Sequence, residues 1–158
     1  MADFRTAVLI TIDNEGGYVD NPNDKGGPTK YGITQSDMPG KVIADLTTAD
    51  AVAYYAEHYW KPLYSQITDQ DIVNKLFDMG VLFGTGEAAY LLQRALNFLP
   101  PQWTKIFDEP TLLATNATDP ADLLKRYKMH LLAHAMNIAN ANPNNREFIT
   151  GWSRRIQL

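Results

Sequence analysis

The sequence has no cysteine among its 158 residues. Without cysteine the fold contains no disulfide, and the chain offers neither a thiol nucleophile nor a cysteine-bound metal site. Long hydrophobic runs are missing as well, so we expect no membrane-spanning helix. The first residues also lack the basic leader and the cleavage site of a signal peptide. We therefore expect a protein that is made in a cytoplasm and needs another route of release if it acts outside.

Charge is moderate and unevenly distributed. Hydrophobic residues make up 45% and charged residues 20% of the chain, which is typical of one soluble globular domain. The net charge is -4, yet residues 1–102 carry 7 basic and 13 acidic groups, whereas residues 103–158 carry 7 basic and 5 acidic groups. The C-terminal part could therefore make weak contacts with anions of a wall or membrane. We expect no nucleic-acid partner, and nothing in the sequence requires more than a monomer.

The stretch from Glu15 to Thr34 reads EGGYVDNPNDKGGPTKYGIT and carries most of the chemical signal. Two glycines directly after an apolar periodic segment predict that Glu15 ends the first helix. The helix dipole disfavours an acid at that end, so we expect a raised carboxyl pKa, which suits a general acid. Asp24 follows in a glycine-rich loop. Two carboxylates in unlike surroundings are the minimum needed to cleave a glycosidic bond.

The rest of the chain is predicted to be mostly helical. A loop with a small β-hairpin follows the first helix. Hydrophobic periodicity and capping signals predict helices over residues 3–15, 47–61, 69–83, 86–98 and 119–140, followed by a last amphipathic helix carrying Phe148, Trp152 and Ile156. Pro100 and Pro101 break the chain after the fourth helix. We place a boundary there, between residues 1–98 and residues 99–158, and expect the two parts to pack as one compact unit.

The identities within residues 15–34 closely resemble the signature of the glycosyl hydrolase family 108 muramidases, which are common as bacteriophage endolysins. They are Glu15-Gly16-Gly17, Asp24, Gly26-Gly27, Thr29, Tyr31 and Gly32-Ile33-Thr34. Residues 92–96 and 151–155 look like the ends of the peptidoglycan-binding region that follows in that family. The resemblance implies a lysozyme-like helical fold with a catalytic part over residues 1–98 and a C-terminal part that binds peptidoglycan. It also implies hydrolysis of the bond between N-acetylmuramic acid and N-acetylglucosamine, after release from a host cytoplasm to the cell wall in the periplasm.

The resemblance makes Glu15 the catalytic acid. The interval from Glu15 to Asp24 also resembles that of a second phage lysozyme group, in which a glutamate, an aspartate and a threonine form the site. Asp24 could steer a water or stabilise the charge on the sugar, and Thr29 or Thr34 could hold that water. Tyr18 and Tyr31 could line a sugar subsite, because aromatic faces pack on sugar rings.

Three alternatives stay open from the sequence. A lytic transglycosylase would need only one glutamate and would leave anhydro sugar ends. A non-catalytic wall-binding or virion protein could keep the fold without activity. A metal-dependent amidase would need ligands, and the spacing of His130 and His134 with one further histidine, His58, does not provide the zinc-protease motif. We therefore expect no metal and no cofactor.

Overall fold

The computed structural model describes residues 2–20 and 27–158. Its α-helices are α1 (Phe4–Glu15), α2 (Thr48–His58), α3 (Gln70–Phe83), α4 (Thr85–Ala95), α5 (Glu109–Ala117), α6 (Pro120–Ala141) and α7 (Ile149–Gln157). Short 3-10 helices are η1 (Ile43–Asp45), η2 (Pro62–Gln66) and η3 (Pro143–Phe148). The strands β1 (Thr29–Lys30) and β2 (Ile33–Thr34) pair antiparallel after α1. The predicted lysozyme-like, mostly helical fold with a small hairpin is confirmed.

Side-chain caps explain where several helices begin. The carboxylate of Asp3 accepts a hydrogen bond from the Thr6 amide at the start of α1. Thr47 and Asp50 form the predicted reciprocal capping box at the start of α2. Asp119 caps α6, whose first residue is Pro120. These residues satisfy amide groups that a helix N-terminus leaves unpaired, which is why the sequence signals located these helices well.

Three helices differ from the prediction. α4 ends at Ala95, before the predicted end at residue 98. α2 ends at His58, before the predicted end at residue 61, and the Tyr59 and Trp60 side chains that follow pack against the hydrophobic core. α5 was not predicted at all. Asp108 caps it by accepting a hydrogen bond from the Thr111 amide, and Pro110 lies in its first turn. Residues 108–112 therefore begin a helix that the hydrophobic periodicity does not predict.

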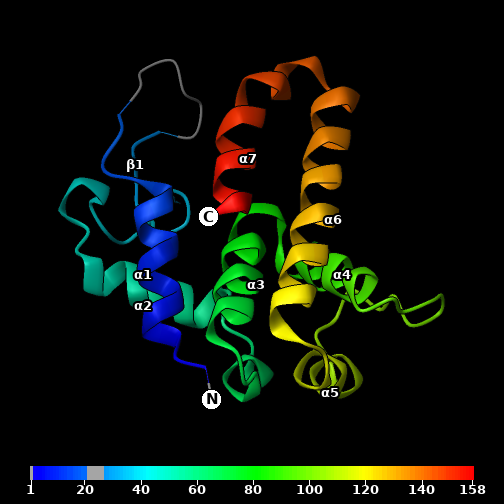
Figure 1. The fold of residues 1–158 in the computed structure, drawn as a ribbon. Helices are drawn as coiled ribbons and strands as arrows, with labels where there is room; N and C mark the ends of the chain where they lie inside the picture. Colours follow the sequence, from blue (N-terminus) through cyan, green and yellow to red (C-terminus); the bar gives the residue numbers. More distant parts are fainter. Residues whose placement is uncertain (1, 21–26) are drawn as a thin grey trace.

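One hydrophobic core joins elements from both parts of the chain. Buried side chains in the cluster include Val8 of α1, Phe77 of α3, Leu92 of α4, Leu131 of α6 and Ile156 of α7. Figure 1 shows α3 near the centre, with α7 running alongside α6 toward it. No described helix combines the length and the apolar character needed to cross a lipid bilayer. The division of function at residue 98 stays a prediction.

Candidate active site

Glu15 is the last residue of α1, as predicted. Gly16 follows with a φ of 84°, and its amide donates a hydrogen bond to the carbonyl of Ile12. A residue with a side chain rarely adopts this φ, so the glycine ends the helix at that point. The helix end leaves the half-buried Glu15 side chain next to the hairpin that follows it in sequence.

The turn of the hairpin lies against the Glu15 carboxylate. Lys30 pairs with Ile33, so Tyr31 and Gly32 form a two-residue turn with φ values of 55° and 75°. Positive φ at both positions matches the right-handed twist of a tight hairpin. A Cβ atom added to Gly32 would lie 2.6 Å from Glu15 Oε2 and 2.8 Å from the Tyr55 hydroxyl. Only glycine permits both this backbone conformation and this approach.

Tyr55 of α2 holds the hairpin turn in place through a hydrogen bond. Its hydroxyl donates a hydrogen bond of 2.7 Å to the carbonyl of Tyr31. The Tyr55 side chain is almost fully buried on α2, and burial together with the negative charge of Glu15 raises its pKa well above the usual value. The hydroxyl therefore stays protonated and keeps donating. The turn, α2 and the carboxylate of Glu15 are thus held as one unit.

Arg155 of α7 reaches the same carboxylate from the other side. Its Nη1 lies 2.8 Å from Glu15 Oε1, and its Nη2 and Nε donate to Asp78 Oδ1 and Oδ2 at 2.9 and 3.0 Å. The Arg155 side chain is 11% exposed. Burial alone would lower its pKa, but the hydrogen bonds and charges of Asp78 and Glu15 outweigh it and raise the pKa. The guanidinium is a permanent cation between two acids.

Asp78 holds this cation in place. It lies on α3 with 2% of its side chain exposed, and it accepts further hydrogen bonds from the Thr11 hydroxyl at 2.9 Å and from the Asn14 amide at 3.3 Å. Every donor to it comes from α1 or α7. A buried carboxylate with this many partners is a positioning group. The excess of basic residues in residues 103–158 gave no indication that Arg155 is buried in this network.

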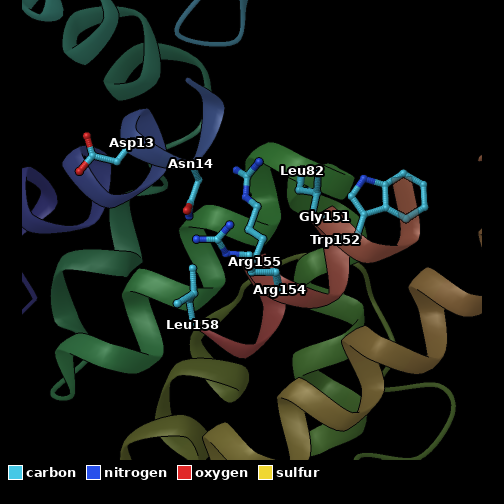
Figure 2. Close-up of a pocket in the computed structure, with 8 residues that line it drawn as sticks. All are labelled: Asp13, Asn14, Leu82, Gly151, Trp152, Arg154, Arg155 and Leu158. Carbon is cyan, nitrogen blue, oxygen red and sulfur yellow. The ribbon is translucent and has the colours of Figure 1, made fainter. Parts of the chain in front are cut away.

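A cavity opens beside the network. It has a volume of about 430 Å³ and lies between the end of α1 and α7. Figure 2 shows the residues that line it, which are Asp13, Asn14, Leu82, Gly151, Trp152, Arg154, Arg155 and Leu158. Arg155 both lines the cavity and contacts Glu15. The space is therefore one side chain away from the predicted acid.

The other predicted site residues make the following contacts. Thr29 donates from its hydroxyl to the Gly27 carbonyl at 3.4 Å, and Thr34 donates to Asp37 at 2.8 Å. Tyr18 is 46% exposed, with its hydroxyl 3.4 Å from Asp20. The half-buried Tyr31 sits in the hairpin turn. Asp24 lies outside the described residues.

The two threonines and two tyrosines thus lie in or close to the hairpin region that contacts Glu15. Val19 pairs with Thr29 in an isolated bridge, so the backbone next to Tyr18 joins the hairpin. The bonds of Thr34 with Asp37 and Ser36 close a turn after β2. Their assignment to the site stays a prediction.

Comparisons with known proteins agree with this architecture. Residues 8–84 match the family described as Glycosyl hydrolase 108. Among solved structures, that of SagA from Brucella abortus has a TM-score of 0.75 at 24% sequence identity, covering 98% of this chain and 89% of SagA. At this identity the likeness concerns the fold. No curated protein sequence gives a significant match. The family resemblance is confirmed for residues 8–84, whereas the resemblance of residues 92–96 and 151–155 stays a prediction.

Proposed function

We propose that this chain, whose residues 8–84 match the Glycosyl hydrolase 108 family, is a muramidase. Its proposed reaction is hydrolysis of the β-1,4 bond between N-acetylmuramic acid and N-acetylglucosamine in bacterial peptidoglycan. The observation that carries the proposal is the position of Glu15, enclosed by the hairpin turn at Gly32 on one side and by Arg155 on the other. The carboxyl group is positioned one side chain away from an open cavity, and a positioned carboxyl group suits proton transfer to a bound sugar.

In the proposed mechanism, protonated Glu15 donates its proton to the glycosidic oxygen. The bond between the anomeric carbon and that oxygen breaks, and its electron pair stays on the leaving oxygen. Positive charge grows on the sugar ring as this happens. A water then adds its oxygen to the anomeric carbon and gives a proton to a carboxylate of the site, either the now ionised Glu15 or Asp24. Both product ends carry hydroxyl groups, one of them reducing.

The ion pair with Arg155 affects proton donation by Glu15. Its ion pair is a contact of the ionised carboxylate, whereas proton donation needs the protonated form. Glu15 must therefore loosen the pair as substrate binds. The bonds from Arg155 to Asp78 do not depend on Glu15, so the guanidinium can stay in place meanwhile.

The remaining roles are proposals of the same kind. Asp24 directs the water or stabilises the charge on the sugar. Thr29 or Thr34 holds the water, and Tyr18 and Tyr31 line a sugar subsite. Loss of turnover in Asp24→Asn would support a water-directing partner, and unchanged turnover would remove Asp24 from the mechanism.

Analysis of the released sugars tests the proposed reaction. Purified peptidoglycan is digested with the wild type, and the soluble products are examined by mass spectrometry. Reducing muramic acid ends are the expected result. Anhydro muramic acid ends would identify a lytic transglycosylase, and free peptides with intact glycan would identify an amidase. No release of any product would favour a non-catalytic wall-binding protein.

The biological setting is proposed from the family resemblance. Muramidases of this kind are common as bacteriophage endolysins, which destroy the host wall at the end of infection. We extend the proposal to that role, with a monomer that reaches peptidoglycan after release from the host cytoplasm. Lysis of host cells when the protein is delivered to the periplasm would support the setting, and its absence with an enzyme active on isolated wall would contradict it.

A further inference from the structure

Two arginines line the cavity near Glu15, but only one of them pairs with the Glu15 carboxylate. Arg154 and Arg155 both line it, on consecutive positions of α7. Arg155 is committed to Asp78 and Glu15. Arg154 is exposed and, within residues 2–20 and 27–158, has no carboxylate at ion-pair distance. One guanidinium is therefore available in a cavity next to the proposed site of cleavage.

Asp13 is the acidic residue among those that line the cavity, and its carboxylate does not form an ion pair with Arg154. Figure 2 shows the two arginine side chains next to Asn14, while the carboxylate of Asp13 points away from them. Asn14 donates its amide to Asp78. Among the described residues that line the cavity, Arg154 therefore supplies a positive charge that is not paired with a carboxylate. This is a local cationic site on a protein whose net charge is -4.

An aromatic wall completes the cavity. Trp152 lines it and is held by Phe83, whose ring meets the indole edge-on at 5.9 Å, and by Phe148, which stacks on it at 5.9 Å. Leu82 adds apolar surface. A rigid aromatic wall beside a free guanidinium binds a group that is partly apolar and carries a negative charge.

The proposed substrate has only one part with that chemistry. The N-acetylated sugars of the glycan strand are neutral, whereas the peptide attached to the lactyl group of muramic acid carries free carboxylates. We propose that the cavity lined by Arg154 and Trp152 binds this stem peptide, with Arg154 pairing with a peptide carboxylate. The inference rests on the proposed function, because the substrate class comes from it.

Binding of soluble muropeptides tests the inference without catalysis. The ligands are the disaccharide N-acetylglucosaminyl-N-acetylmuramic acid with its tetrapeptide and the same disaccharide with its lactyl carboxyl group capped as a neutral methylamide. Both contain only the bond from N-acetylglucosamine to N-acetylmuramic acid, and neither contains the bond from N-acetylmuramic acid to N-acetylglucosamine that is proposed to be cut. Affinities are measured by calorimetry for the wild type, Arg154→Gln and Arg154→Lys. The matched control is Arg146→Gln, which removes an exposed arginine of η3 that does not line the cavity.

The wild type should bind the peptide-bearing ligand about three- to tenfold more tightly, the range of one or two charge-assisted contacts at an accessible site. Arg154→Gln should lose this preference, Arg154→Lys should keep part of it, and Arg146→Gln should keep all of it. The preference should shrink at high salt. Equal binding of both ligands by the wild type, or a preference that survives in Arg154→Gln, would overturn the inference.

The binding test of the peptide site and the digestion test of the proposed muramidase can fail independently. A wild type that prefers the peptide-bearing ligand but releases no sugars from peptidoglycan would support the peptide site and refute the muramidase. A wild type that releases reducing muramic acid ends but shows no preference would refute the peptide site alone. Because Arg154 is exposed, its replacement by glutamine should leave the fold intact, which circular dichroism checks.

Discussion

Arg155 and Glu15 form an ion pair of 2.8 Å between the last helix and the first. The same guanidinium donates two hydrogen bonds to the buried Asp78 on α3. Three helices therefore meet at one side chain. The predicted catalytic part thus depends, for the position of its acid, on a residue of the predicted C-terminal part.

Replacing Arg155 by methionine should lower the free energy of unfolding by about 3 kcal/mol, because it leaves the buried Asp78 without its cation. The hydrogen bonds from Thr11 and Asn14 remain and keep the loss from being larger. Urea denaturation measures the change. Arg154→Gln is the control and should stay within about 0.5 kcal/mol of the wild type. Equal stability of Arg155→Met and the control would contradict the network.

Replacing Gly32 by alanine should disturb the acid directly. The new Cβ would lie 2.6 Å from Glu15 Oε2, and the residue would keep a φ of 75°. We expect activity on peptidoglycan to fall about a hundredfold, because the carboxyl group must move. Stability should fall by about 1–2 kcal/mol from the backbone conformation. Initial rates of peptidoglycan release measure the effect.

Gly17→Ala is the matched control for the Gly32 prediction. Gly17 also lies next to Glu15, but an added Cβ would meet no atom within 4 Å, and its φ is outside the left-handed region. Its activity should stay within a few-fold of the wild type. A Gly32→Ala variant as active as Gly17→Ala would show that the close approach to Glu15 does not matter for function.

Lys75 predicts a pH dependence of stability. Burial lowers its pKa to about 8 from 10.5, although the charge of Asp78 opposes the shift. Between these values the unfolded chain binds the proton and the folded chain does not, so the free energy of unfolding should rise with pH in this window. Relative to Lys75→Met, the wild type should gain about 2 kcal/mol from pH 8 to pH 10. A constant difference between the two proteins across this range would contradict the prediction.

Local signals in the sequence located most helices and placed Glu15 correctly at the end of α1. The two glycines after Glu15 and the capping pair of Thr47 and Asp50 act within a few residues of the structure they determine, so they can be read without the fold. The missed helix α5 is short, and Pro110 in its first turn resembled a turn signal. Sequence patterns of this length do not separate a helix start from a turn.

The partners of Glu15 could not be predicted in the same way. The contact with Arg155 depends on how α7 packs on α3, and the contact with Gly32 depends on where the hairpin folds back on α1. The charge count over residues 103–158 therefore does not distinguish the buried Arg155 from the other basic residues. The positions of basic and acidic residues along the chain carry no information about these distances between residues far apart in sequence.

The most direct test of the account is the digestion of purified peptidoglycan by Glu15→Gln beside the wild type. Glutamine keeps the size of the side chain and removes the proton that the mechanism donates. Glu57→Gln, which changes an exposed glutamate of α2, is the control. The account predicts that the wild type and the control release reducing muramic acid ends. Glu15→Gln should release them at a rate at least about a hundredfold lower. Equal rates for all three proteins would show that Glu15 is not the acid.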